Sequence, residues 1–426
     1  MRRMMIALTA ILLASLPAAA QEPKPLRPRL AANSCIECHS QFEDELLEPT
    51  LHVKEDIHFQ KELACHDCHG GNPEAGGDGD PEAAHDPAHG FRGKPSRADT
   101  PKFCARCHAD ATYMKRFNPH ARVDQLSEYR TSRHGMLLAT GDDRVAICTD
   151  CHGVHGIRAI KDPRSSVHPT RVADTCSRCH SDPGRMEAYG LPTDQFASYR
   201  TSVHAGALYD QGDLSAPTCN DCHGSHGAVP PGVAQVSNVC GSCHGREATL
   251  FREVEERKGI NLSACIQCMI CHGNHAVQRP NDDMLGVGPR SSCTSCHPEG
   301  DKNYGAIADM GEAVTTLVAR LGEADDLIDQ AEIAGMEVGP DRFALQKARD
   351  QLVEARVLAH GFDRDRFIEV TDEGIAAADA GIVAGRRAFA DLRFRRTGLA
   401  LSLVVIAAVI IALAMKIKDL ERQKTV

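Results

Sequence analysis

The sequence "CTDCHGVHG" runs from Cys148 to Gly156, and "CNDCHGSHG" repeats it from Cys219 to Gly227, 71 residues further along the chain. Each copy places a histidine directly after a Cys-x-x-Cys pair, then a glycine, and then a second histidine three residues after the first. The repetition therefore points to chemistry at the cysteines and histidines.

Cysteine spacing favours covalent haem attachment. The chain has 19 cysteines in 426 residues, and eighteen of them form nine Cys-x-x-Cys-His motifs. In such motifs the two thiols bond the porphyrin and the histidine ligates the iron. Zinc ribbons or a disulfide scaffold would not require a histidine after every pair. The predicted attachment cysteines are Cys35, Cys38, Cys65, Cys68, Cys104, Cys107, Cys148, Cys151, Cys176, Cys179, Cys219, Cys222, Cys240, Cys243, Cys268, Cys271, Cys293 and Cys296, and the predicted proximal iron ligands are His39, His69, His108, His152, His180, His223, His244, His272 and His297.

Haem must also supply the core of this part of the chain. The nine motifs leave about 31 residues each between Gln21 and His297, the whole chain has no tryptophan, and only 4% of its residues are aromatic. Such a segment cannot bury a large aliphatic core of its own, whereas each porphyrin buries extensive apolar surface. The sequence predicts a mostly irregular fold with short helices packed around nine c-type haems in residues 21–300.

Internal repetition groups the motifs in pairs, with a period near 71 residues. One unit runs from Cys104 through "YRTSRHG" at Tyr129 to "CTDCHGVHG", and the next from Cys176 through "YRTSVHAG" at Tyr199 to "CNDCHGSHG". A shortened third unit has motifs at Cys240 and Cys268. The motifs at Cys35 and Cys65 form a degenerate first unit, and the motif at Cys293 closes the array. We therefore expect a string of haem pairs.

The second histidine of "CHGVHG" is predicted to ligate a neighbouring haem. Three residues extend at most about 11 Å, too little to carry His155 around the ring that His152 holds. The motif would then hold two haems close together, with glycine allowing the backbone to turn. Packing of the histidine beside a ring is the alternative. The main candidates for distal iron ligands are His58, His134, His155, His204, His226 and His275; further candidates are His52, His85, His89, His120, His168 and His360.

Cys265 is the one cysteine outside the motifs. Pairing it with Cys268 would put Met269 in the ligand position, so Cys268 and Cys271 with His272 are preferred. Cys265 is then a buried free thiol or part of an unusual attachment.

Both ends of the chain carry targeting signals. Residues 1–20 have a basic start, an apolar run and small residues near Ala20, as in a cleaved secretory signal. Near the other end, the eighteen residues 398–415 carry no charge, so residues 397–416 are predicted to form a transmembrane helix, with a buried core helix as the alternative. The basic residues of the tail, 417–426, suit the cytoplasmic side. The predicted location is the bacterial periplasm, with the protein anchored in the inner membrane.

Residues 301–396 have a different character. Cysteine disappears, and apolar residues follow steps of three and four from Ile307 to Ala331, from Leu345 to Phe362 and from Ile368 to Leu392. The sequence "GMEVGP" from Gly335 to Pro340 ends the first run. This pattern predicts an all-α stalk, either an antiparallel hairpin or three helices. The stalk is a spacer or docks a membrane subunit, and His360 within it either packs or serves as a distal ligand.

The charge balance limits the partners. The formal net charge is −10, and haem propionates would add to it. Nucleic acid is therefore not expected as a partner, and a basic patch on a redox protein is favoured.

The motifs and the repeated CHGxH sequence resemble those of multihaem c-type cytochromes of the class III and doubled Cys-x-x-Cys-His kind, over residues 35–297. The C-terminal "FRRTGLALSLVVIAAVIIALAMKIKDLER" after a stalk is similar to membrane-attached members, which pass electrons between a quinone-linked membrane complex and periplasmic partners. Membrane-anchored tetrahaem quinol dehydrogenases carry an N-terminal anchor, whereas the anchor predicted here is C-terminal.

Two functions are compatible with these features. The first is electron transfer through a chain of mainly bis-histidine haems between a quinone-linked membrane complex and periplasmic redox proteins, with no catalytic residue. The alternative is a reductase or oxidase of a small nitrogen or sulfur compound at one haem with an open coordination position. The nine motif histidines favour electron transfer, since multihaem nitrite reductases often have lysine in place of one of them. Whether the protein is an enzyme is left open.

Overall fold

The computed structural model describes residues 33–75, 79–228, 234–259 and 268–424. It forms two compact units, one ending at Thr175 and joined by His226–Ala228, the other made of Cys176–Ser225 and the chain from Val229 onward. The described residues are helical and contain no strand. The predicted signal sequence and Cys265 lie outside the described residues.

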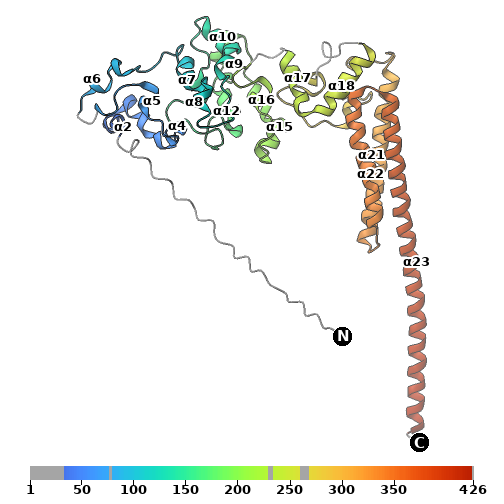
Figure 1. Cartoon of the computed structure of the whole chain (residues 1–426). Helices are drawn as coiled ribbons and strands as arrows, with labels where there is room; N and C mark the ends of the chain where they lie inside the picture. The colour runs from blue at the N-terminus through green and yellow to red at the C-terminus, as the bar shows by residue number, and fades with distance from the viewer. Residues whose placement is uncertain (1–32, 76–78, 229–233, 260–267, 425–426) are drawn as a thin grey trace, which may run out of the picture. The chain divides into compact units, whose positions relative to one another are not determined.

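The first unit is built of short helices and turns joined by irregular chain (Figure 1). Its elements are α2 (Ser34–His39), η1 (Asp44–Leu46), α3 (Glu48–Leu51), η2 (Val53–Glu55), α4 (Ile57–Gln60), α5 (Cys65–His69), α6 (Pro81–Ala84), η4 (Pro87–His89), α7 (Thr100–His108), α8 (Ala111–Met114), α9 (Gln125–Thr131), α10 (Arg133–Ala139) and α11 (Cys148–His152), and α12 (Pro169–His180) leads into the second unit.

The second unit begins in the same style and ends in three long helices. Its elements are α13 (Pro183–Met186), η5 (Glu187–Tyr189), α14 (Gln195–Arg200), α15 (Val203–Ala205), η6 (Gly206–Asp210), α16 (Cys219–His223), α17 (Ala234–Cys243), α18 (Gly245–Lys258), α20 (Cys268–His272), η7 (Asp282–Met284), α21 (Tyr304–Ile333), α22 (Gly339–Leu358), η8 (Ala359–Gly361) and α23 (Arg364–Lys424).

Burial is distributed unevenly between the two styles of structure. Of the buried apolar residues among those described, twelve lie before residue 300 and seventeen lie between Met310 and Ala388. The stalk thus contains a core of apolar side chains, whereas the longer N-terminal part has few buried apolar side chains. This imbalance is what a polypeptide folded around large prosthetic groups would show.

The stalk is a three-helix bundle in which α21 and α22 pack along the first part of α23 (Figure 1). The apolar stripes expected from the sequence lie inside it. Leu317, Ile328 and Leu345 are at most 1% exposed, and Phe367 on α23 is fully buried. The expectation was wrong at Phe362, which is 45% exposed because it follows the helical turn η8 in a left-handed conformation, with φ of 45°.

Glycines on α23 allow the helices to approach closely. A Cβ atom added at Gly385 would meet the Cβ of Leu327 at 2.7 Å, and one at Gly374 would meet Leu317 at 2.8 Å. Any larger residue at these positions would force the helices apart. Small residues therefore fix the spacing of the bundle.

The C-terminal part of α23 extends beyond the bundle (Figure 1). Within the described residues, α23 is the one helix long and apolar enough to cross a membrane, and its apolar stretch is not buried against the rest of the protein. By length and composition it is consistent with a membrane anchor.

Replacement of Phe367 by alanine tests the bundle core. We expect Phe367→Ala to lower the free energy of unfolding of the stalk by about 3–5 kcal/mol, because a fully buried ring leaves a cavity. The matched control is Phe343→Ala on α22, where the ring is 82% exposed, and its effect should stay within about 0.5 kcal/mol. Guanidinium unfolding followed by helical circular dichroism measures both. Equal losses would contradict the assigned packing.

Candidate haem sites

Eight of the nine Cys-x-x-Cys-His motifs coincide with helices or helix ends. The exception is the motif at Cys293, which forms turns between η7 and α21. Motifs occur in pairs along the chain. In the first three pairs, the second motif has an aspartate two residues after its first cysteine, and this aspartate accepts a hydrogen bond from the backbone amide of the residue that precedes the motif. These bonds are Asp67 to the Ala64 N–H at 2.7 Å, Asp150 to Ile147 at 2.7 Å and Asp221 to Thr218 at 2.8 Å. A carboxylate at this place stabilises the start of so short a helix.

The cysteines of successive motifs meet in pairs. The thiols of Cys35 and Cys65 lie close together and shift each other's pKa, and so do those of Cys104 and Cys148. The same contact joins Cys176 to Cys219 and Cys240 to Cys268. Four pairs of motifs therefore lie side by side, in the grouping that the repeat indicates, and the motif at Cys293 lies outside them.

The glycine that follows each second motif is required by backbone conformation. Gly153, Gly224 and Gly273 have φ of 81°, 82° and 72°. Other residues rarely adopt this conformation. The chain therefore turns sharply inside each Cys-His-Gly-x-His segment, here called the CHGxH clip (Cys151–His155, Cys222–His226 and Cys271–His275), and the second histidine is directed away from the first.

Seven motif histidines each face a histidine from a different segment. The ring centroids are separated by 6.0 Å for His39 and His85, 5.9 Å for His58 and His108, 6.3 Å for His69 and His155, 6.1 Å for His152 and His226, 6.5 Å for His204 and His244, 5.9 Å for His223 and His275, and 6.1 Å for His272 and His360.

This separation fits an iron held between two imidazoles. With metal–nitrogen bonds of about 2 Å and about 1.1 Å from each ring nitrogen to its ring centre, two axial ligands place their centroids about 6 Å apart. Zinc has no comparable site, because no three His, Cys, Asp or Glu side chains converge on a metal-ion position in the described ranges. The residues present therefore fit haem.

Hydrogen bonds at the Nδ1 atoms orient several of these imidazoles. The Nδ1 atoms of His39, His69 and His85 lie 3.2, 3.0 and 2.8 Å from backbone carbonyl oxygens, and the Nδ1 of His360 lies 2.9 Å from the Val357 carbonyl. Donation from Nδ1 leaves the lone pair on Nε2, the nitrogen available to a metal.

Burial keeps many of the paired histidines neutral. Burial is the largest cause of the lowered pKa of His108, His152, His155, His180, His204, His226, His272 and His275. Neutral imidazole is the form that binds iron, so a lowered pKa favours ligation near neutral pH.

The Tyr-Arg-Thr-Ser-x-His elements (Tyr129–His134 and Tyr199–His204) are short supports for a histidine. The Tyr129 hydroxyl donates to the Ala146 carbonyl at 2.9 Å, and the Tyr199 hydroxyl donates to the Pro217 carbonyl at 3.0 Å. Burial raises the pKa of both tyrosines to about 12, so both remain donors. The serine before each histidine then caps the following turn. His134 lies on α10 in the position that His204 has on α15.

A backbone hydrogen bond repeats where two candidate ligands approach each other. The amide of Ile57, before His58, donates to the Ile157 carbonyl, two residues after His155, at 2.6 Å. In the same way, the Arg133 amide donates to the Ala228 carbonyl at 3.0 Å, and the Val203 amide donates to the Val277 carbonyl at 2.8 Å. The pair of ligand-bearing segments is thus one recurring structural unit, which the sequence period alone did not reveal.

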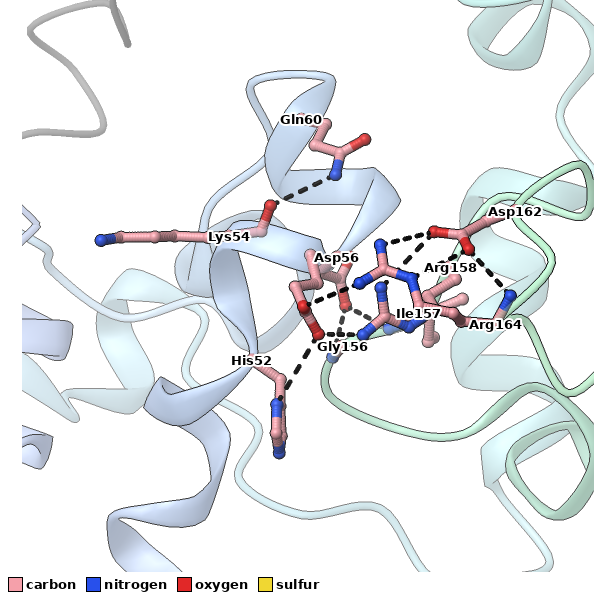
Figure 2. A network of polar contacts seen from close by, with 10 residues as sticks. His52, Lys54, Asp56, Gln60, Gly156, Ile157, Arg158, Asp162 and Arg164 are labelled. Carbon is pink, nitrogen blue, oxygen red and sulfur yellow. Dashed lines mark hydrogen bonds and ion pairs between the residues drawn. The ribbon is translucent and has the colours of Figure 1, made fainter.

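Asp56 secures the first of these units (Figure 2). One carboxylate oxygen accepts from the His58 amide at 2.8 Å and lies 3.0 Å from its Nδ1, and the other accepts from the amides of Gly156 and Ile157 at 2.9 Å. Burial acts to raise the pKa of Asp56, but these hydrogen bonds outweigh it and lower the pKa. Nearby, Arg158 and Arg164 bind both Glu55 and Asp162 across the same two segments.

Four of the further candidates are not brought within ring contact of a motif histidine, although all 22 histidines belong to the described residues. His52 lies 4.0 Å from Glu55, and His89 lies 2.9 Å from Asp86. His168 is buried and lies 2.8 Å from the Thr170 hydroxyl, while His120 is exposed. Of that group, the structure brings His85 and His360 to motif histidines. Neither stood out in the sequence, because neither lies in a repeated element.

Comparison with known proteins supports the same class. The chain is similar to the multiheme cytochrome MtrA of Shewanella baltica (strain OS185), with 25% identity over 192 residues, which are 42% of this chain and 51% of MtrA. The chain therefore spans about half the length of that relative. No family model and no solved structure matches it.

This distant similarity supports a multihaem c-type cytochrome with covalently bound haem c. It also supports electron transfer with redox partners as the function of the class.

Replacement of Asp56 tests the geometry of the first ligand pair. Asp56→Ala removes an acceptor from three amides and from the His58 ring. We expect the local structure to lose about 1.5–3 kcal/mol and some haem to change from low-spin to high-spin as His58 and His155 are released. Electron paramagnetic resonance (EPR) of the ferric protein measures the change.

The control for this variant is Asp213→Ala. Asp213 is also a loop aspartate, but it accepts hydrogen bonds from the amide and hydroxyl of Ser215. Its replacement should leave the spin state unchanged, and equal spectra for the two variants would contradict the role given to Asp56.

Proposed function

We propose that this protein is an exported, membrane-anchored multihaem cytochrome that carries electrons through a chain of mainly bis-histidine haems. The electrons pass between a quinone-linked membrane complex and periplasmic redox proteins. The observation that carries the proposal is the set of seven histidine pairs with centroids 5.9–6.5 Å apart. Iron with two protein ligands has no free position for a substrate, so such haems transfer electrons.

In this proposal each Cys-x-x-Cys-His motif holds one haem through its cysteines and its histidine. His85, His58, His155, His226, His275, His204 and His360 supply the sixth ligand to the haems of the motif histidines that they face. His134 has the same role by its equivalence to His204.

The CHGxH clips explain how the haems form a continuous path. His155 follows His152 by three residues and faces His69, so one clip serves the haem of its own motif and that of the preceding pair. His226 and His275 repeat this relation with His152 and His223. Because three residues span at most about 11 Å, the haems joined by one clip are close neighbours. Contact of the thiols within each pair adds the second connection.

Axial ligation indicates the range of potentials. Methionine ligands raise the potential of c-type haem relative to histidine. Seven of the predicted haems have a histidine facing the proximal ligand. We therefore place the chain at low potential, which suits anaerobic respiration.

The stalk sets the distance to the membrane. From Arg364, where α23 starts, to Gly398, where its uncharged stretch begins, 34 residues span about 50 Å at 1.5 Å per residue. A tilt of about 20°, average for membrane helices, shortens this only slightly. His360 precedes α23, so the haem that it ligates would stand far above the bilayer. The donor is then a protein that projects from the membrane, and not quinol within it.

Spectroscopy of the whole protein tests the proposal. Ferric EPR should show mainly low-spin haem, and membranes that contain the quinone-linked complex should reduce the protein, which a basic periplasmic redox protein should reoxidise. A majority of high-spin haem would overturn electron transfer through bis-histidine haems.

Removal of the anchor is expected to change the location but not the haems. A chain that ends after Arg396 should move from the membrane to the soluble periplasmic fraction and keep its visible spectrum, because the bundle core ends near Leu392. Haem staining of the separated fractions measures this. Retention in the membrane by the shortened chain would contradict an anchor in residues 397–416.

Replacement of His360 tests the link between the stalk and the haems. His360→Ala should convert one haem from low-spin to high-spin, because the ring that faces His272 at 6.1 Å is lost. The matched control is His120→Ala, at an exposed histidine. An unchanged spectrum for His360→Ala would show that His360 only packs in the stalk.

A further inference from the structure

The motif at Cys293 differs from the other eight in two respects. It lies outside the pairs formed by the cysteine contacts. Its residues form turns where the other motifs form or end helices. In addition, its histidine, His297, is hydrogen-bonded to a carboxylate, with Nδ1 2.9 Å from Asp301 Oδ1.

In the second unit, no histidine remains to face His297. Those outside the motifs are His204, His275 and His360. Each already faces the motif histidine of another haem. The His297 ring lies instead beside Asp301 and, at 3.4 Å, the Asn303 amide.

The segment that carries this motif is firmly held against the stalk. Arg356 on α22 makes two hydrogen bonds of 2.8 Å to Asp282, and a Cβ atom on Gly311 of α21 would meet the Gly286 Cα at 2.5 Å. The Ser292 amide also donates to the Met284 carbonyl at 3.0 Å. The site is therefore part of the folded unit, and the lack of a facing histidine does not arise from a frayed end.

The carboxylate suits an iron that binds small ligands. A carboxylate that accepts the Nδ1 proton of a metal-bound histidine makes the imidazole a stronger donor to the metal. An electron-rich ferrous iron binds π-acceptor ligands well. By contrast, the Nδ1 atoms of His39 and His69 contact backbone carbonyls, which withdraw the proton less strongly.

We propose that the haem attached at Cys293 and Cys296 has no histidine as sixth ligand and binds small neutral π-acceptor molecules such as nitric oxide and carbon monoxide. The inference rests on the proposed function, in which the other haems are closed by histidine and deliver electrons to this one. It gives an otherwise closed electron carrier a single place where an external ligand can reach iron.

Carbon monoxide is the probe for this site. The reduced, full-length protein should bind about one carbon monoxide per chain, and the ferric protein should show a high-spin EPR signal from about one haem in nine. Replacement of both cysteines, Cys293→Ser with Cys296→Ser, should abolish both signals and reduce the mass by one haem. Binding that survives this change would place the open site elsewhere and overturn the proposal.

Two further variants keep the haem in place. Asp301→Asn should lower the iron–histidine stretching frequency in the resonance Raman spectrum of the ferrous protein, because the neutral amide is a weaker acceptor. Met284→Ala should leave carbon monoxide binding unchanged. If binding appeared only in Met284→Ala, a methionine would be the sixth ligand and the proposal would fail.

The results separate this proposal from the function on which it depends. An entirely low-spin protein that binds no carbon monoxide would overturn the open site and leave the electron carrier intact. High-spin haem at many positions would overturn the electron carrier itself. An unshifted Raman frequency in Asp301→Asn would overturn the role of the carboxylate.

Discussion

The pairing of histidines from distant parts of the chain is the constraint on which this structure depends, and in the proposed function each pair holds an iron between its two imidazoles. His360 and His272 are 88 residues apart in the sequence, yet their rings face each other at 6.1 Å. His58 and His108 are drawn together in the same way at 5.9 Å. Each such pair closes a long loop of the chain. The conformational entropy lost on closing that loop is too large to be offset by side-chain burial in the irregular chain. Short helices and a sparse apolar core are the consequence.

Local backbone features place the candidate histidine ligands. Glycine with positive φ turns each CHGxH clip, and backbone bonds such as Ile57 to Ile157 hold two ligand-bearing segments together. Where serine caps the turn in two repeats, Asp56 performs a wider role in the first, because it binds both segments at once. The differences show that the repeat conserves the placement of the histidine and not the particular cap.

In the proposed function the stalk combines support with ligation of a haem. Its helices enclose a core of buried apolar residues to which Leu250 of α18 also belongs, while η8 at its end presents His360 toward His272. Arg257 reinforces this end through Asp363 at 2.7 Å and the Gly361 carbonyl at 2.9 Å. A spacer that also donates a ligand would fix the last haems at a set height above the membrane, which favours exchange of electrons with projecting protein domains.

The sequence by itself indicated covalently bound haem and predicted the grouping of motifs in pairs and the helical stalk, because covalent attachment and helix amphipathicity require particular residues at fixed short spacings. It also indicated that His155 would serve a neighbouring haem, since three residues cannot cross a porphyrin. Only the tertiary structure decided which histidine faces which. His85 and His360 belong to no repeated motif, and His52 and His168 are equally plausible by composition. Ligation across an iron joins residues without regard to their separation along the chain, so no local pattern records the partner.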